Sequence, residues 1–171
     1  MGIRLANIID FDISDSCDGV SISLWTAGCP HKCPGCHNSR LWDGSDFPVV
    51  SKEEILDRLI KSMKKSDIKK NLSILGGEPL IPENVADLDF IISEFHKCFP
   101  ESSIYIWTGY TLKELKKRKD KHLKNIFKNI TFLIDGRFEI NKKKSLRLRG
   151  SSNQNIYKRS IFGLTKVHSK D

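Results

Sequence analysis

The strongest constraint on the fold is the regular alternation of short apolar segments with amphipathic ones. Four segments carry the Val, Ile, Leu and aromatic pattern of strands: residues 20–25, 72–75, 103–107 and 130–134. Between them, apolar residues recur at helical spacing after a capping signal or a proline, at Ser51, Pro82 and Thr111. Strands that alternate with helices predict βα units around a mostly parallel sheet. We therefore expect an α/β fold that forms an open, partial (βα) barrel.

The length of 171 residues suits one domain, and no repeat or linker divides the chain. We expect a single domain over residues 1–171, with an N-terminal extension or hairpin at 1–19 and a polar C-terminal tail at 155–171. The chain is 39% apolar, and no run approaches the ~20 apolar residues of a spanning helix. The N-terminus also lacks the pattern of a signal peptide. These features predict a cytoplasmic protein.

Four unusual sequences directly follow the four predicted strands. They are a cysteine loop at 29–36, GGEP at 76–79, TGY at 108–110 and DGR at 135–137. Ligands of parallel α/β sheets bind at the carboxyl ends of the strands. We expect these four sequences to crowd onto one rim of the fold.

The cysteine loop carries the chemistry of a metal or cluster site. Cys29, Cys33 and Cys36 stand at spacing C-x3-C-x2-C, and two prolines and a glycine between them keep the loop irregular. A closed structural metal site takes four ligands, and a common all-cysteine iron–sulfur site also takes four. Three thiolates around a four-iron cluster would leave one iron open for another ligand.

A zinc site of the Cys3His type is the rival interpretation, with His31 or His37 as the fourth ligand. A zinc site would explain the cysteine loop but would not explain the GGEP sequence. The remaining cysteines, Cys17 and Cys98, are predicted to be inert buried thiols. Five cysteines with three in one loop fit a reducing compartment better than a disulfide framework.

The spacing of the three cysteines resembles that of the radical S-adenosylmethionine (radical SAM) superfamily. The neighbouring segments narrow the resemblance to the proteins that activate the anaerobic, oxygen-sensitive ribonucleotide reductase. The match runs in order from about residue 18 to residue 157. The segments that carry it are CPHKCPGCHN at 29–38, GGEPLIPEN at 76–84, WTGYTLKEL at 107–115, DGRF at 135–138 and RGSSNQ at 149–154.

This resemblance implies a barrel of the radical SAM type and a [4Fe–4S] cluster with Cys29, Cys33 and Cys36 as its ligands. S-adenosylmethionine (SAM) would bind the open iron through the amino and carboxylate groups of its methionine part. An electron from the cluster would break a carbon–sulfur bond and yield a 5′-deoxyadenosyl radical. That radical would take a hydrogen from one glycine of the large chain of the anaerobic reductase. A flavodoxin- or ferredoxin-like electron donor is implied as well.

Individual residues receive roles within this site. Glu78 offers a carboxylate to the methionine ammonium, and Gly76 and Gly77 let the backbone approach a ligand without a Cβ. Thr108 is predicted to contact adenosine, and Asp135 the ribose or a partner. All of these segments also suit ordinary turns or core positions. By resemblance, the SAM site further includes Gly35, Cys36, His37 and Asn153.

The positive charge of the chain lies mainly in two stretches. The net charge is +8, and residues 111–128 hold eight basic and two acidic side chains, while residues 141–149 hold five basic and none acidic. A solvated helix face and a landing surface for an acidic partner or nucleic acid both fit this pattern. No aromatic residue interleaves with the lysines at 113–121, which argues against nucleic acid.

The leading functional hypothesis is an activase that generates a glycyl radical on the anaerobic ribonucleotide reductase. Three alternatives stay open: an activator of another glycyl-radical enzyme, a small-molecule radical SAM enzyme such as a deazapurine-type synthase, and a non-enzymatic zinc module. The oligomeric state also stays open, a homodimer included.

Overall fold

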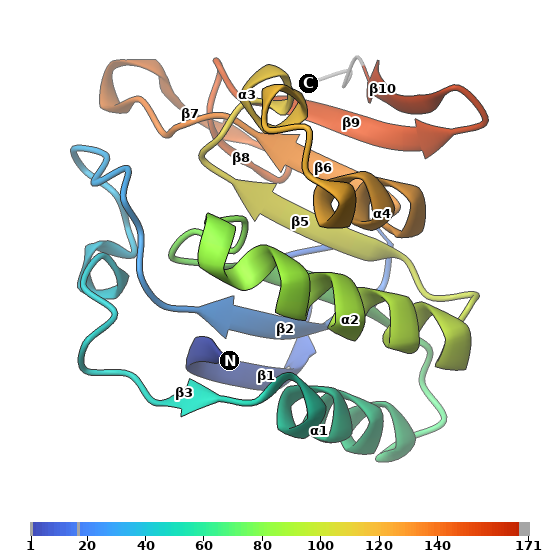
Figure 1. Ribbon diagram of the computed structural model, residues 1–171. Coiled ribbons are helices and arrows are strands. Elements are labelled where there is room, and N and C mark those ends of the chain that lie inside the picture. The colour runs from blue at the N-terminus through green and yellow to red at the C-terminus, as the bar shows by residue number, and fades with distance from the viewer. Residues whose placement is uncertain (1, 17, 168–171) are drawn as a thin grey trace.

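The computed structural model of the protein describes residues 2–16 and 18–167, and its strands form one large and one small sheet (Figure 1). The large sheet has eight strands in the order β10-β9-β6-β5-β4-β2-β1-β3. Its strands are β1 (Ile3–Asp12), β2 (Val20–Thr26), β3 (Val49–Val50), β4 (Lys70–Gly76), β5 (Ile104–Thr108), β6 (Phe132–Asp135), β9 (Asn155–Ser160) and β10 (Gly163–Val167). The small sheet pairs β7 (Lys143–Leu146) with β8 (Arg149–Ser151).

The predicted α/β class with a parallel central sheet is confirmed. The four strands β2, β4, β5 and β6 are neighbours and run parallel, and antiparallel strands flank them on both sides. The sheet is open, because β3 and β10 form its two ends rather than pairing with each other. The helices are α1 (Lys52–Lys64), α2 (Pro82–Cys98), α3 (Leu112–Lys117) and α4 (Lys121–Asn129), and two short 3-10 helices are η1 (Ser39–Leu41) and η2 (Ile140–Lys142).

The two faces of the sheet differ because successive side chains of a strand point in opposite directions. Helices α1, α2 and α4 lie on one face (Figure 1), and apolar residues of the central strands, such as Leu24 and Ile106, are fully buried in the core beneath them. The other face carries a smaller cluster around Tyr105, Ile134 and Ile156. This second face is therefore the one without a helical layer.

The helix beginning at Thr111 has the predicted reciprocal cap. The Thr111 hydroxyl accepts the backbone N–H of Glu114 at 3.2 Å, and the Glu114 carboxylate accepts the backbone N–H of Thr111 at 2.7 Å. One continuous helix was expected after this cap, but the chain breaks into α3 and α4. Lys119 adopts a positive φ of 53°, and Asp120 caps α4 by accepting the N–H groups of His122 and Leu123. Asp120 was the sequence signal for this break.

The expectation of a polar tail from residue 155 was wrong. Residues 155–160 form β9, which pairs antiparallel with β6, and residues 163–167 form β10 beside it. Ile156 is buried against Tyr105 and Ile134, so this segment completes the second face of the sheet. Strands β7 and β8 form a hairpin whose turn is residues 147–148, with Leu148 at a φ of 62°.

At the N-terminal end of the chain, β1 pairs antiparallel with β2. Cys98 is exposed at the end of α2, so the expectation that it is buried was wrong. Cys17 lies outside the described residues. Within residues 2–16 and 18–167, none of the helices has both the length and the apolar character needed to cross a membrane.

Candidate functional site

The four strand-end sequences meet around one cavity of about 580 Å³ at the carboxyl ends of the parallel strands. All three cysteines of the loop line this cavity, and each is partly buried. The other three sequences contribute the lining residues Gly76, Gly77, Thr108, Gly109 and Gly136. The prediction that these sequences share one rim is confirmed.

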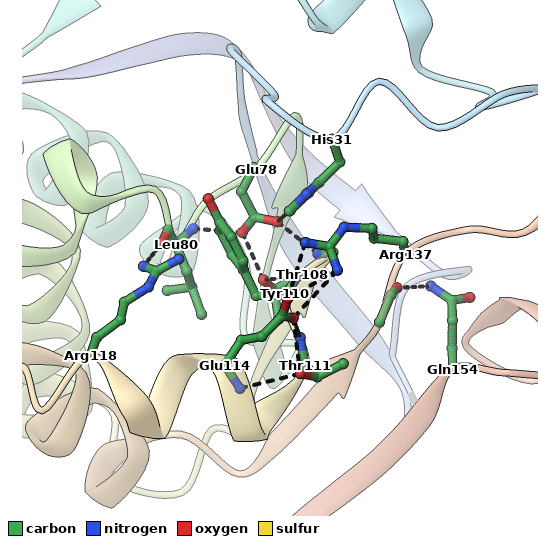
Figure 2. Close-up of polar contacts among 12 residues, drawn as sticks. His31, Glu78, Leu80, Thr108, Tyr110, Thr111, Glu114, Arg118, Arg137 and Gln154 are labelled. Atoms are coloured by element: carbon green, nitrogen blue, oxygen red, sulfur yellow. Dashed lines mark hydrogen bonds and ion pairs between the residues drawn. The ribbon is translucent and has the colours of Figure 1, made fainter.

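Glu78 is the central polar residue of this rim, and its side chain is fully buried. One carboxylate oxygen accepts the backbone N–H of Leu80 at 2.9 Å and the hydroxyl of Thr108 at 2.7 Å. The other accepts the backbone N–H of Gly109 at 2.7 Å and lies 2.9 Å from Nε2 of His31 (Figure 2). A carboxylate offers about four lone-pair sites. Through these hydrogen bonds Glu78 links the cysteine loop to the ends of β4 and β5.

His31 fits a socket formed by the same strand ends. Its side chain is 5% exposed, and its ring meets the ring of Tyr110 edge-on with the centroids 4.4 Å apart. A Cβ on Gly109 would lie 2.3 Å from Cδ2 of His31, so only glycine leaves room for the ring. The bond to Glu78 and this packing fix the position of the loop between Cys29 and Cys33.

Gly109→Ala should displace the His31 ring and lower the free energy of unfolding by about 1–3 kcal/mol, the usual cost of overpacking. Urea unfolding of the cluster-free protein measures this loss. The matched test is the same substitution in a His31→Ala background, where the added methyl meets no ring and should cost little. An equal cost in both backgrounds would show that His31 does not occupy this socket.

Packing of the backbone also explains why glycine stands at both positions of GGEP. A Cβ on Gly76 would lie 2.4 Å from the carbonyl oxygen of Thr26, and one on Gly77 would lie 2.5 Å from that of Gly28. The backbone N–H of Gly77 donates to Thr26 and that of Glu78 to Gly28, both at 2.8 Å. Gly76 and Gly77 were predicted to let a ligand come close to the backbone. In the structure they also let the backbone of residues 76–78 pack against the backbone of residues 26–28, directly before Cys29.

Gly77→Ala should therefore disturb the start of the cysteine loop. The obstacle is a backbone carbonyl, which cannot rotate away as a side chain can, so we expect a loss of about 1–3 kcal/mol or more in the free energy of unfolding. Thermal or urea unfolding of the cluster-free protein checks this. Gly163→Ala is a control for backbone conformation alone, since Gly163 has a φ of +95° but nothing within 4 Å of an added Cβ. Gly77 has no positive φ, so a Gly77→Ala variant as stable as the unaltered protein would remove the steric argument.

Two of the predicted SAM-site residues are used elsewhere in the structure. Asp135 is 1% exposed; its carboxylate accepts the N–H of Leu112 at 2.6 Å and the side-chain amide of Asn155 at 2.9 Å. It thereby caps α3 and fastens β9 to β6. Asn153 donates from its side chain to the carbonyl of Arg137 at 2.8 Å. Asp135 and Asn153 are not among the described residues that line the cavity, whereas their neighbours Gly136 and Gln154 are.

The other predicted positions lie in the cysteine loop itself. His37 lines the cavity. Gly35 has a φ of 74° and packs on Ile140, where an added Cβ would lie 2.8 Å from the side chain. The structure thus brings Cys36, His37 and Thr108 to the cavity, whereas Gly35 turns the loop beside it.

Several lining residues were not found by reasoning from the sequence. They are Ser14, Asp15, Trp25, Trp42 and most of the β7–β8 hairpin from Lys143 to Leu148. Trp25 is on the strand face away from the helices, and strand alternation could have revealed it. The indole N–H groups of Trp25 and Trp42 are buried and have no hydrogen-bond partner within residues 2–16 and 18–167. Unpaired buried donors beside a cavity fit a site that receives a ligand.

The acid–base properties of the cavity follow from burial. Burial is the main cause that raises the pKa of Asp15 to about 7, and the neighbouring carboxylate of Asp12 adds to it. Burial also raises the pKa of the thiols of Cys29 and Cys33. These two thiols would have to lose their protons when a metal binds.

Asp15 should make the cluster-free protein less stable as the pH rises. Its pKa is about 7 in the folded chain against an ordinary value of 3.8, so the folded state binds more protons between these values. The stability that protonation contributes is complete below pH 3.8 and is lost as the pH passes 7. Asp15→Asn should abolish this part of the pH dependence, as urea midpoints at several pH values would show. An unchanged profile would contradict the raised pKa.

The geometry also bears on which metal centre the loop could hold. Within the described parts of the chain, no three His, Cys, Asp or Glu side chains are arranged around a point as ligands of a single metal ion. A zinc site needs that arrangement. A four-iron cluster does not, because each thiolate binds a different iron. Three cysteine thiols line one cavity, and thiolates are the ligands that iron–sulfur clusters take in proteins.

Comparison with known proteins agrees with this class of site. The family described as a 4Fe-4S single cluster domain matches residues 16–157. Three relatives are each named an anaerobic ribonucleoside-triphosphate reductase-activating protein. The one from Pasteurella multocida is 39% identical over 82% of this chain and 89% of its own length. The one from Escherichia coli K12 is 34% identical over 81% and 88%, and the one from Enterobacteria phage T4 is 32% identical over 81% and 84%. The chain belongs to the family of anaerobic ribonucleoside-triphosphate reductase-activating proteins.

Proposed function

We propose that this protein is a radical SAM activase that generates a glycyl radical on the large chain of the anaerobic ribonucleotide reductase. The observation that carries the proposal is the single cavity lined by Cys29, Cys33, Cys36 and the ends of β4 and β5. The names of the relatives favour the reductase over other glycyl-radical enzymes and over a small-molecule substrate. When bound, the cluster and SAM supply a 5′-deoxyadenosyl radical that can take a hydrogen from a glycine.

In this proposal the three cysteines are the ligands of a [4Fe–4S] cluster. Their thiols lie in a loop whose position is fixed by the contact between His31 and Glu78. The indole N–H groups of Trp25 and Trp42 can donate to whatever occupies the cavity, and hydrogen bonds to the sulfurs of a cluster tune its potential.

SAM would lie along the rim formed by Gly76, Gly77, His37 and Thr108, all of which line the cavity. Gly76 and Gly77 would offer backbone groups to the methionine part. Glu78 would act through its neighbours, because it holds the Thr108 hydroxyl and the Gly109 N–H in place. We retain from the resemblance three further positions that flank lining residues: Gly35, Asp135 and Asn153.

An open site suits a polypeptide substrate. The helices cover one face of the sheet. The β7–β8 hairpin borders the cavity and comes from neither these helices nor the large sheet. We propose that the sheet is an open, partial barrel of the radical SAM type, in which a glycine-bearing loop of the reductase reaches the cavity. Its lining includes Lys143 and Lys144 of the hairpin, which are exposed and free to meet such a loop.

The remaining parts of the proposal rest on the resemblance and on cysteine usage. They are a single domain over residues 1–171, a cytoplasmic location, and a flavodoxin- or ferredoxin-like electron donor.

The proposal is tested by the products of SAM. Anaerobically reconstituted protein, supplied with a reductant and SAM, should form methionine and 5′-deoxyadenosine in equal amounts. Cys36→Ser protein is the control and should form neither. A reconstituted protein that holds iron and sulfide but leaves SAM intact would exclude the radical SAM mechanism.

A further inference from the structure

A second cavity, of about 420 Å³, lies between α3, α4 and the tip of the β9–β10 hairpin. We call it the α4 groove. Its apolar side chains come from all three elements, and they are Leu115, Leu123, Phe127, Phe162 and Leu164. None of these residues belongs to the cavity that holds the cysteines.

Positive charge surrounds the apolar floor of the α4 groove. Four of its lining residues are exposed lysines: Lys116, Lys119, Lys124 and Lys128. One lining residue is acidic, Asp120, and its carboxylate is already used to cap α4, at 2.7 Å from the N–H of His122 and 3.1 Å from that of Leu123. The groove therefore combines an apolar floor with a surplus of positive charge at its edge.

The structure separates Arg118 from the groove lysines within the basic stretch 111–128. Arg118 points inward, donates to the carbonyl of Leu80 at 2.6 Å, and lies with its guanidinium carbon 4.1 Å from the ring centroid of Tyr110 (Figure 2). Arg118 thus supports the rim near Glu78. The four lysines of the α4 groove remain on the surface, and in the described parts of the chain none of them forms an ion pair.

The hairpin tip adds two apolar side chains in an unusual position. Ile161 is 93% exposed and Phe162 is 91% exposed, and Phe162 borders the α4 groove. Large exposed apolar side chains that adjoin a groove mark sites of protein association. Aromatic residues of this kind often supply much of the binding energy at an interface.

We propose that the α4 groove is a docking site for an acidic segment of the reductase large chain that also carries apolar side chains; this inference rests on the proposed function. The charge of the rim favours carboxylates, and the floor with Phe162 favours apolar side chains. Helix α3 connects the groove to the active site, because its N-cap Thr111 directly follows Gly109 and Tyr110, which pack against His31. The tip of the β9–β10 hairpin lies at the amino end of β6, because Phe132 pairs with Lys158, whereas the cavity lies at the carboxyl end. A partner whose loop entered the cavity would therefore reach Phe162 by extending along α3 and α4.

The test measures binding of the purified, cluster-loaded protein to the reductase large chain at low and high ionic strength. One variant replaces the four groove lysines by glutamine, and a second is Phe162→Ala. Matched controls are a variant with glutamine at four other exposed lysines, Lys61, Lys64, Lys69 and Lys97, and Ile68→Ala, which also alters an exposed apolar residue.

We expect the groove lysine variant to associate about tenfold more slowly at low ionic strength and to lose most of its salt dependence, because rim charges steer association. Phe162→Ala should weaken binding by about tenfold at every ionic strength, as for an interface anchor. Both variants should keep the iron content and the SAM cleavage of the unaltered protein. The control variants should bind as the unaltered protein does.

Normal binding of the reductase by both groove variants would overturn the inference, as would an equal loss in the controls. Slower reduction of the cluster with normal reductase binding would also overturn it, and would assign the groove to the electron donor. The proposed function fails separately, if the unaltered protein cleaves SAM but activates no reductase.

Discussion

Serine in place of any one of Cys29, Cys33 and Cys36 should abolish the cluster. The thiolate is the iron ligand, and a site with three protein ligands has none to spare. Protein prepared without oxygen should hold about four iron and four sulfide per chain, and each serine variant close to none. Colorimetric iron and sulfide analysis, with the visible absorption of the cluster, measures the effect.

Cys98→Ser is the matched control for this prediction. Cys98 is exposed at the end of α2, whereas the three loop cysteines line the cavity. The variant should retain its iron and sulfide, and Cys17→Ser should do so as well. A colourless protein that contains zinc in place of iron would contradict the assignment of the cysteine loop.

Loss of the Glu78 side chain should have the largest effect on stability. In Glu78→Ala, the backbone N–H groups of Leu80 and Gly109 lose their partner, and so do the side chains of Thr108 and His31. Each buried group left unpaired costs about 1–3 kcal/mol. We expect the free energy of unfolding to fall by at least about 3 kcal/mol, which is a large part of the roughly 5–15 kcal/mol of a typical domain.

Glu78→Gln should give an intermediate loss of about 1–3 kcal/mol, since its amide group must face either the N–H of Leu80 or that of Gly109. Urea unfolding of the cluster-free variants measures both losses. Combination with His31→Ala should show a coupling of about 0.5–3 kcal/mol, as for residues in direct contact. If Glu78→Gln is as stable as the unaltered protein but binds SAM about tenfold more weakly, Glu78 contacts SAM and does not hold the loop in place.

The parts of the fold that could be predicted are those set by local sequence. Strand and helix periodicity gave the parallel centre of the sheet, and the Thr111–Glu114 cap fixed the start of α3. Because the unusual sequences follow directly after parallel strands, their meeting at one rim follows from topology alone. The cysteine loop needed no structure to be recognised.

The parts that could not be predicted depend on contacts distant in the sequence. The contacts of Glu78 with His31, Thr108 and Gly109 could not be predicted, because these partners lie 30 to 47 positions away in the sequence. Asp15 lies in a loop without a motif, and its raised pKa arises mainly from burial, with the neighbouring Asp12 carboxylate adding to it. Strands β9 and β10 looked polar because only a few of their side chains, such as Ile156, are buried.

The central claim is that this protein generates a radical on a glycine of the anaerobic reductase. Electron paramagnetic resonance tests it most directly, with the reduced protein, SAM and the reductase large chain combined without oxygen. We expect a doublet from the single α-hydrogen of a glycyl radical. Deuterium at that glycine should collapse the splitting and appear in the 5′-deoxyadenosine. Cleavage of SAM with no radical on the reductase chain would contradict the claim.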